Sequence, residues 1–373
     1  MSLLSIGMSG LNAAQGSLSV LSNNIANVNT PGYSRQQTTQ NANANNPYGG
    51  VFIGSGTTLA DVRRVYNEFL DQAYQNSTSL NNDAKAYSSQ ASAIDKTLSD
   101  KTTGMSSVLS AFFAAVQTSS ANPSDVSARQ VLLTSAQTLS NRFNSISNQL
   151  NQQKESINGQ LSTMSDQVNQ LTASIASLNK QITQVQGSSN SAPANLLDAR
   201  NEAVRSLNEL VGVTASEKNG VFSVSTGTGQ SLVLGDQSNT ISAVPSASDP
   251  SQYTIQLNAG GGTAIDLGNV LSGGSIGGLL RYRSDALMPA INDLGRIAIA
   301  TADTVNSQLG QGLDLNGDFG TSLFKDINSA AAIAQRSQGA AGNSVGSGNL
   351  NVSIKDSSKL STYDYKVTFT SAV

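Results

Sequence analysis

The sequence predicts a mainly helical α+β protein of several domains, with β insertions between its helices. Three observations support this prediction: an apolar repeat of three to four positions over the first 28 residues, a seven-residue repeat within 125–186, and strand-like runs between glycine-rich turns at 214–270. We expect an amino-terminal assembly helix, a long antiparallel helical bundle, a small β unit and the start of a second β domain.

The first expected helix has one apolar face and an uncharged polar back. Pro31 cannot donate a backbone hydrogen bond and disfavours helical geometry at Thr30, so the helix should end by about Asn29. No charged side chain precedes Arg35, whereas helices that lie on membranes usually carry Lys or Arg on the polar face. We therefore expect other helices to cover the apolar face. Its residues are Leu4, Gly7, Leu11, Ala14, Leu18, Leu21, Ile25 and Val28.

Residues 34–60 are rich in Gln, Asn, Thr and Gly. A loop is expected at 43–50, and short strands are expected at 51–53 and 57–62. Charged residues become frequent from Asp61 onward, which marks the expected change from the assembly segment to the body of the chain.

A mostly helical segment is predicted at 66–120, with a break near 102–104. One face of this segment should carry Phe69, Ala73, Leu80, Ala84, Tyr87, Ala91, Ile94 and Leu98. A turn follows at 122–125, where Ser124 or Asp125 should cap the next helix.

The longest predicted helix covers 125–186 and has a coiled-coil-like seam. Flanking positions carry Asn, Gln, Ser and Thr rather than the charges that usually select the partner of a free coiled coil. We therefore expect an antiparallel bundle within the chain. The seam combines Leu150, Ile157, Met164, Leu171, Leu178 and Val185 with Leu161, Val168, Ile175 and Ile182.

The remaining elements alternate between helix and strand. A helix is predicted at about 195–212, and a last helix should run from Gly277 to about Leu309 with a kink or division at Pro289. A connector is expected at 328–350. The expected strands are 222–225, 231–234, 253–257 and 264–267, followed by a second β region at 352–354 and 363–369. The predicted domains are 1–60, 61–213, 214–270, 271–325 and 326–373.

Composition excludes several kinds of function. The chain has no Cys and no His, so thiolate and imidazole metal sites, His-dependent triads and disulfides cannot form. A net charge of −3 gives no electrostatic signal for nucleic acid. The sequence contains no 18-residue apolar run, which argues against membrane insertion, and the amino terminus does not resemble a cleaved secretory signal.

The sequence contains only weak matches to metal-binding or catalytic motifs. Residues 314–320 have the alternating oxygen ligands of a calcium loop, but Phe319 stands at its glycine position and Lys325 at its bidentate glutamate position. We therefore predict an Asx-type turn there, and hairpin loops at 227–229 and 260–262. An embedded peptidoglycan hydrolase would need a pair of carboxylates, and no pair stands out. We predict no catalytic residue, no metal and no cofactor.

Residues 10–15 and 22–36 closely resemble the amino-terminal signature of the bacterial flagellar axial proteins, the family of rod, hook and hook-associated proteins. The continuation Tyr33-Ser34-Arg35-Gln36 is most similar to the hook-associated members at the hook–filament junction. The order of later segments, a helix, a β insertion, a Gly-Gly-Leu-Leu helix and an Asp-Leu-Asn-Gly turn, is also the order in the family. The signature residues are Asn23, Asn24, Asn27, Asn29, Thr30, Pro31, Gly32 and Tyr33.

The resemblance implies a non-enzymatic structural subunit whose first helix inserts into the inner wall of a tube. The implied subunit interface is Leu4, Leu11, Ala14, Leu18, Leu21, Ile25 and Val28. Implied partners are further copies of the chain, hook protein, the adjacent junction protein or flagellin, and an export chaperone. Export through the flagellar type III apparatus is also implied. Family members end in a carboxy-terminal helix that pairs with the first helix, and no such helix occurs within the 373 residues, which puts polymerisation of this form in doubt.

Two alternatives remain open. The chain could be a hook or distal-rod protein, although the long helix at 125–186 and the helix beginning at Gly277 argue against this. It could also be a surface adhesin whose β regions bind a host ligand.

Overall fold

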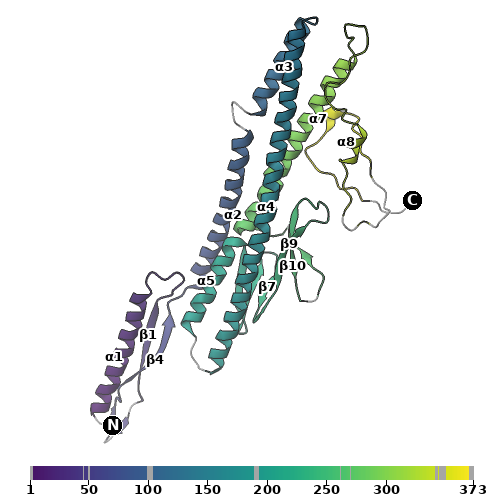
Figure 1. The fold of residues 1–373 in the computed structure, drawn as a ribbon. Helices are drawn as coiled ribbons and strands as arrows, with labels where there is room; N and C mark the ends of the chain where they lie inside the picture. Colours follow the sequence, from purple (N-terminus) through teal and green to yellow (C-terminus); the bar gives the residue numbers. More distant parts are fainter. Residues whose placement is uncertain are drawn as a thin grey trace.

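The computed structural model describes residues 3–44, 46–48, 51–98, 104–188, 193–260, 262–268, 270–340, 343 and 350–368. The molecule is a long rod (Figure 1). Helix α1 (Leu3–Ala26) and the strands β1 (Gln36–Ala42) and β4 (Thr57–Arg64) form one end. Long helices and small antiparallel sheets form the remainder, which confirms the predicted α+β class.

Strands β1 and β4 form an antiparallel ribbon along α1, and β2 (Asn46–Tyr48) pairs with β3 (Val51–Ile53). The strands predicted at 51–53 and 57–62 are confirmed. The loop predicted at 43–50 is wrong for 46–48, which form β2, while residues 45, 49 and 50 lie outside the described residues. Strand β1 escaped prediction because its sequence, QQTTQNA, has no apolar alternation.

Helix α2 (Glu68–Leu98) corrects the predicted apolar face. Tyr87, Ala91 and Ile94 pack against the main core as expected, but Phe69 is 75% exposed and Leu80 is also exposed. The first half of α2 instead turns a polar face inward, comprising Asp71, Gln75 and Ser79. Asp71 and Gln75 bind polar side chains of α5 (Ala194–Leu210), and Ser79 lies close to the glycines that precede α6 (Gly274–Tyr282).

Helices α2 and α3 (Met105–Ala121) are separate, as predicted. Of the expected break at 102–104, only Gly104 is described. The predicted turn at 122–125 leads into α4, and Asp125 Oδ1 accepts the Ser127 N–H at 2.8 Å, which confirms Asp125 as the cap.

Helix α4 (Val126–Ser188) runs along most of the rod (Figure 1). It packs against α3 and α5, its neighbours on either side in the chain, which confirms the intramolecular bundle. The predicted seam is mostly buried: Leu150, Ile157, Leu161, Val168, Ile175 and Ile182 are buried, whereas Val185 is exposed.

Three asparagines of α4 attach the β unit to the helix. Asn169 exchanges two hydrogen bonds with the backbone of Ile241 in β9, and Asn158 bonds the backbone of Ser251 and Tyr253, where the turn before β10 enters the strand. Asn179 Nδ2 donates to the carbonyl oxygen of Gly235 at 2.6 Å. These uncharged polar positions beside the seam therefore bind the backbone of strands and turns of the β unit, which the sequence did not predict.

The β unit contains two antiparallel sheets. One has the order β5-β6-β7-β8 and the other β11-β10-β9. All four predicted strands are confirmed, and β5, β8 and β9 were not predicted. Residues 227–229 form the predicted turn between β6 and β7. The bounds are β5 (Val213–Lys218), β6 (Val221–Thr226), β7 (Ser231–Leu234), β8 (Gln237–Ser238), β9 (Thr240–Pro245), β10 (Tyr253–Asn258) and β11 (Ile265–Asp266).

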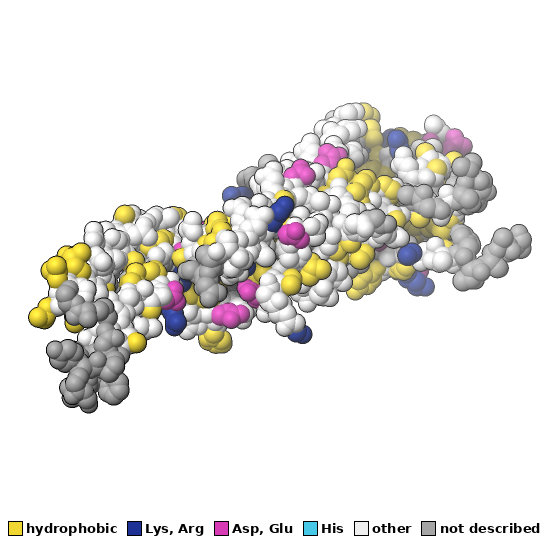
Figure 2. Space-filling model, turned by 90° about the horizontal axis from the view of Figure 1, so that it is seen from below, with side chains coloured by type: hydrophobic (Ala, Val, Ile, Leu, Met, Phe, Trp, Pro, Cys, Tyr) yellow, Lys and Arg dark blue, Asp and Glu magenta, His cyan; other side chains and the backbone are white. Residues whose placement is uncertain are grey.

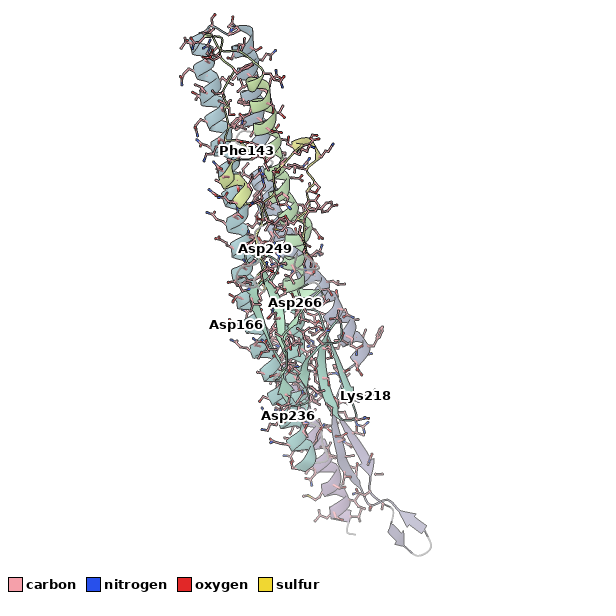
Figure 3. The ribbon with its side chains drawn as sticks, turned by 90° about the vertical axis from the view of Figure 1, so that its right-hand side faces the viewer. Phe143, Asp166, Lys218, Asp236, Asp249 and Asp266 are labelled. Carbon is pink, nitrogen blue, oxygen red and sulfur yellow. The ribbon has the colours of Figure 1, made fainter. Side chains whose placement is uncertain are left out.

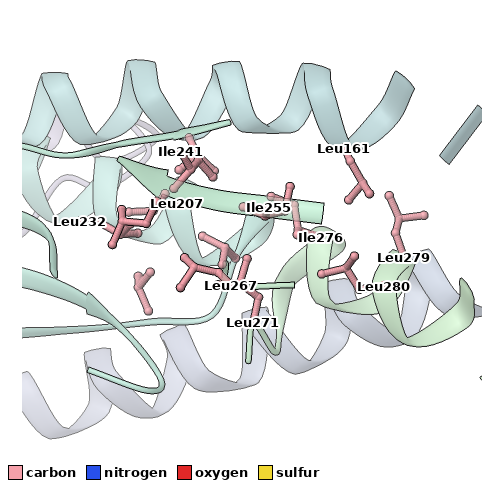
Figure 4. Close-up of a cluster of buried hydrophobic side chains, with 14 of the residues drawn as sticks. Leu161, Leu207, Leu232, Ile241, Ile255, Leu267, Leu271, Ile276, Leu279 and Leu280 are labelled. Carbon is pink, nitrogen blue, oxygen red and sulfur yellow. The ribbon is translucent and has the colours of Figure 1, made fainter. Parts of the chain in front are cut away.

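The main core lies where α4, α5, α6 and both sheets meet. Figure 4 shows side chains from these elements, including Leu161, Leu207, Ile255 and Leu279, pointing toward one another. Helix α6 crosses α2 closely because Gly278 has no side chain, and a Cβ there would lie 2.2 Å from the Asp83 carbonyl oxygen.

The last predicted helix is divided. A π-helical turn at Arg283–Leu287 separates α6 from α7 (Met288–Gly310). Pro289 lies in the first turn of α7, directly after the π-helical turn, and having no N–H it cannot continue the backbone hydrogen bonds of the helix. The expected division therefore occurs just before the proline.

The second β region is not observed. Residues 352–354 and 363–368 contain no strand, Phe369 lies outside the described residues, and the connector contains the short helix α8 (Ala330–Ala334). Asn328 Nδ2 donates to the Ile354 carbonyl oxygen, and Asn328 Oδ1 accepts the Ile354 N–H. Side-chain bonds thus replace the strand partner that this segment lacks among the described residues. No helix in the described ranges is long and apolar enough to cross a membrane.

Candidate assembly surface and its joint

The inner face of α1 lies against the β1–β4 ribbon and consists mainly of small residues, together with Ile6 and Val20. Ala13 is only 3% exposed, and Gly16 leaves room for the Leu59 side chain. Ser9 Oγ accepts the Thr57 N–H at 3.2 Å. Ile6 and Val20 are half-buried on the same side of α1, whereas the leucines of α1 are exposed on the other sides.

The outer face of α1 holds the predicted interface. Leu11 and Leu18 are each 63% exposed, and all seven predicted residues are exposed in the single chain. Figure 2 shows hydrophobic side chains gathered at the end of the molecule that α1 occupies. Val28 lies beyond the last residue of the helix, in the following turn.

Two further apolar residues of α1, Leu3 and Met8, are also exposed, and sequence reasoning omitted them. Met8 lies one turn after Leu4, so the three-to-four spacing could have included it. The exposed apolar surface is consequently wider than the predicted seam.

The signature residues form a hydrogen-bonded turn at the end of α1. Asn24 Oδ1 accepts the Gln36 N–H and the Tyr33 hydroxyl, each at 2.8 Å. Asn23 Nδ2 also donates to the Tyr33 hydroxyl, and Asn27 Nδ2 donates to Asn23 Oδ1. The asparagines thereby fix the direction in which the chain leaves α1 and enters β1.

The other signature residues complete this turn. Thr30 Oγ1 donates to Asn27 Oδ1 at 3.2 Å, whereas Asn29 and Pro31 are exposed. Gly32 has φ +77°, and a Cβ at this position would lie 2.8 Å from Glu202 Oε2 on α5. Gly32 therefore permits both the turn and a close approach to the body.

A buried ion pair completes the joint between this end and the body. Arg64 Nη2 at the end of β4 lies 2.8 Å from Asp198 Oδ1 on α5, and both side chains are nearly buried. The Ser34 N–H donates to Asp198 Oδ2 at 3.1 Å. Asp198 thus binds both chain segments that connect the assembly end to the body. No local sequence signal connects it with residues 34 and 64.

A second polar cluster lies beside the joint. Arg205 Nε on α5 donates to Asp71 Oδ1 at 3.0 Å, and the Tyr66 hydroxyl donates to Asp71 Oδ2 at 3.0 Å. Burial, followed by the hydrogen bond to Asp71, raises the pKa of Tyr66 to about 12. Burial lowers the pKa of Arg205, but its bonds to Asp71 and Glu202 outweigh this, and the net shift is upward. These groups orient the assembly end through charge and hydrogen bonding.

The calcium-like segment is an Asx-type turn, as predicted. Asp314 Oδ1 accepts the N–H groups of Asn316 at 2.8 Å and Asp318 at 3.0 Å, and Gly317 has φ +88°. These backbone hydrogen bonds lower the pKa of Asp314. Among the described residues, no group of three or more Asp or Glu side chains is placed to hold a metal ion.

Comparison with family models gives two matches. Residues 91–324 match the helical domain of flagellar hook-associated protein FlgK, and residues 4–33 match the flagella basal body rod protein family. The first match covers the end of α2, helices α3 to α7 and the β unit. The second covers α1 and the signature turn.

Individual proteins agree with these matches. The chain is 35% identical to flagellar hook-associated protein 1 of Escherichia coli (strain K12) over 372 residues, 99% of this chain and 66% of that protein. It is 28% identical to the protein of the same name from Bacillus subtilis (strain 168) over 350 residues, 84% of this chain and 68% of that protein. The chain thus spans 66% of the length of its Escherichia coli relative.

A solved structure is also similar. The flagellar hook junction protein FlgK from Burkholderia pseudomallei aligns with a TM-score of 0.62 and 35% sequence identity, over 68% of this chain and 46% of that chain. Similarity therefore extends from sequence to fold. The chain belongs to the family of flagellar hook-associated protein FlgK.

Proposed function

We propose that this chain is a non-enzymatic structural subunit of the bacterial flagellum that forms the junction between hook and filament. The observation that carries this proposal is the outer face of α1, where a row of large apolar side chains is exposed on a helix fixed to the body. Family membership specifies the kind of assembly in which such a face would be buried.

Burial between subunits is the proposed driving force. Apolar surface removed from water contributes about 25 cal/mol per Å², so one such face could contribute several kcal/mol per subunit. This gain must offset the entropy lost when subunits associate. The hydrogen-bonded joint already orients α1, so less ordering remains to be done on assembly.

The proposed partners are further copies of the chain, hook protein on one side, and the adjacent junction protein or flagellin on the other. We also propose extracellular placement after export through the flagellar type III apparatus, assisted by a chaperone. These partners follow from the family resemblance.

Immunogold electron microscopy tests the location. Antibodies against the purified chain should label a narrow band between hook and filament on flagella from the source bacterium, and a strain lacking the gene provides the control. Labelling along the whole hook would favour the hook-protein alternative. Labelling of the cell surface away from flagella would favour an adhesin and contradict the proposal.

A further inference from the structure

A small rigid hairpin follows α7, and we call residues 313–319 the tip hairpin. Leu313 and Phe319 form an antiparallel bridge, and the Asp314 N–H donates to the Asp318 carbonyl oxygen at 2.7 Å. The Gly320 N–H donates to the Gly312 carbonyl oxygen at 3.0 Å, just beyond the bridge. With the Asx turn inside it, the hairpin holds its shape through its own hydrogen bonds.

The tip hairpin exposes three large apolar side chains. Phe319 is 74% exposed, and Leu313 and Leu315 are exposed to a similar degree. An apolar group on a rigid support loses little conformational entropy when a partner covers it. The hairpin also carries the acidic side chains of Asp314 and Asp318.

A second exposed surface lies on the first turns of α4, and we call Val126, Arg129 and Leu133 the tip face. Their spacing of three and four places them on one side of the helix. Val126 and Leu133 are exposed, and Arg129 Nε donates to the Pro123 carbonyl oxygen at 2.7 Å. The tip face is therefore apolar with a cation held between its two apolar residues.

The tip hairpin and the tip face lie at the same end of the rod. The Phe324 ring lies 5.8 Å from the Phe112 ring of α3, and Asn306 of α7 exchanges two hydrogen bonds with the Phe324 backbone. Figure 1 accordingly shows the end of α7 beside the turn that joins α3 to α4. Copies arranged around a common axis parallel to the rod would bring one copy's hairpin to the height of its neighbour's tip face.

The two surfaces are complementary in charge. Within the described part of the chain, neither Asp318 nor Arg129 belongs to an ion pair. The hairpin and the tip face are different surfaces, so each copy offers one of them to the neighbour on either side. Such a head-to-tail contact gives a ring when the rotation between copies closes and a helical array when it does not.

We propose that the tip hairpin of one copy packs against the tip face of the next copy, with Asp318 beside Arg129. This inference rests on the proposed function, because it requires copies to stand side by side in a tube. The hairpin is far smaller than the roughly 800 Å² per partner that a stable complex buries. The contact should therefore form in assemblies and not between free chains.

Single cysteines test this contact, because the natural chain has none. Phe319→Cys chains carrying one tag are mixed with Leu133→Cys chains carrying another, and assemblies are prepared and mildly oxidised. A disulfide joining the two tags is necessarily between copies. Val221→Cys, in the β unit away from the tip, replaces Leu133→Cys as the control; Figure 3 shows its neighbourhood through Lys218, far from Phe143.

The expected result is a two-tag product from Phe319→Cys with Leu133→Cys, and none from the control pair. Asp318→Arg should reduce the product about tenfold through like-charge repulsion, and adding Arg129→Asp should restore it. Assemblies without the two-tag product would overturn the tip contact and leave the proposed function standing. Failure to form any assembly, alone or with hook components, would overturn both.

Discussion

The double substitution Leu11→Asp plus Leu18→Asp should block incorporation into flagella while leaving the body folded. Both leucines lie on the outer face of α1, and neither packs against the β1–β4 ribbon, where the small residues lie. In the free chain, the substitutions place two carboxylates in water. In an assembly, they would place them between apolar surfaces.

The free energy of assembly that the double variant loses can be worked out from the exposed fractions of the two leucine side chains. Fully burying a leucine side chain stabilises by about 1.5–3 kcal/mol, so burying the 63% that is still exposed contributes about 1–2 kcal/mol at each position. Together the two substitutions remove about 2–4 kcal/mol of association free energy, which lowers the association constant roughly 30- to 700-fold. Burying the new carboxylates adds to this loss. Surface substitutions usually change the stability of the free chain by less than about 0.5 kcal/mol.

Complementation of a strain lacking the gene is the assay, with motility and the amount of chain in purified flagella as the measurements. Circular dichroism on the free chain checks folding. Leu234→Asp is the matched control, since Leu234 is exposed to a similar degree on β7, in the β unit. Normal motility and incorporation of the double variant would refute the assembly role of α1.

Other predictions concern stability. Asn179→Ala should cost about 1–3 kcal/mol in urea unfolding, because it leaves the Gly235 carbonyl, in the turn between β7 and β8, without its partner. Gly32→Ala should cost about 1–2 kcal/mol through its positive φ, whereas Gly295→Ala, with open space around it inside α7, should stabilise by about 0.5–1 kcal/mol. The folded-state pKa of Tyr66 is raised, so its stabilising effect is complete below pH 10 and is lost as the pH rises toward 12. Tyr66→Phe should therefore lose less stability than the parent over that range. Adding calcium to chelator-treated chain should leave the melting temperature unchanged, because Asp314 Oδ1 already binds two backbone N–H groups.

The opposite outcome of each measurement would contradict the structural role on which that prediction depends. A Gly32→Ala chain as stable as the Gly295→Ala chain would show that the turn beside α5 is not required. If the parent and Tyr66→Phe lost the same stability between pH 10 and 12, the Tyr66 hydroxyl would have no stabilising role. A clear calcium-dependent rise in melting temperature would replace the Asx turn with a metal site.

Local spacing predicted the outer face of α1 because all its residues except Val28 lie on one uninterrupted helix. The same method placed Phe69 and Leu80 on a shared face of α2 but inside the protein, where they are not. Periodicity identifies which residues share a face, and only the neighbours decide whether that face is buried. At α2 those neighbours are Arg205 and the glycines at the start of α6.

The joint could not be predicted for a different reason. Ser34 and Asp198, like Asp71 and Arg205, are more than a hundred positions apart, and no pattern within either segment points to the other. Strand β1 was missed because both of its faces are polar. The family signature at residues 22–36 was recognisable in the sequence, but the hydrogen bonds between Asn24 and Gln36 were found only in the structure.

The three asparagines of α4 have a practical consequence for protein engineering. They fix the β unit to the helix at Ser251, Ile241 and Gly235, none of which lies in the turn at 227–229. A foreign peptide grafted into that turn would leave all three attachment points intact. In the proposed assembly, each copy would then carry its graft at the same height and orientation, which would suit the chain to displaying epitopes or enzymes in regular arrays.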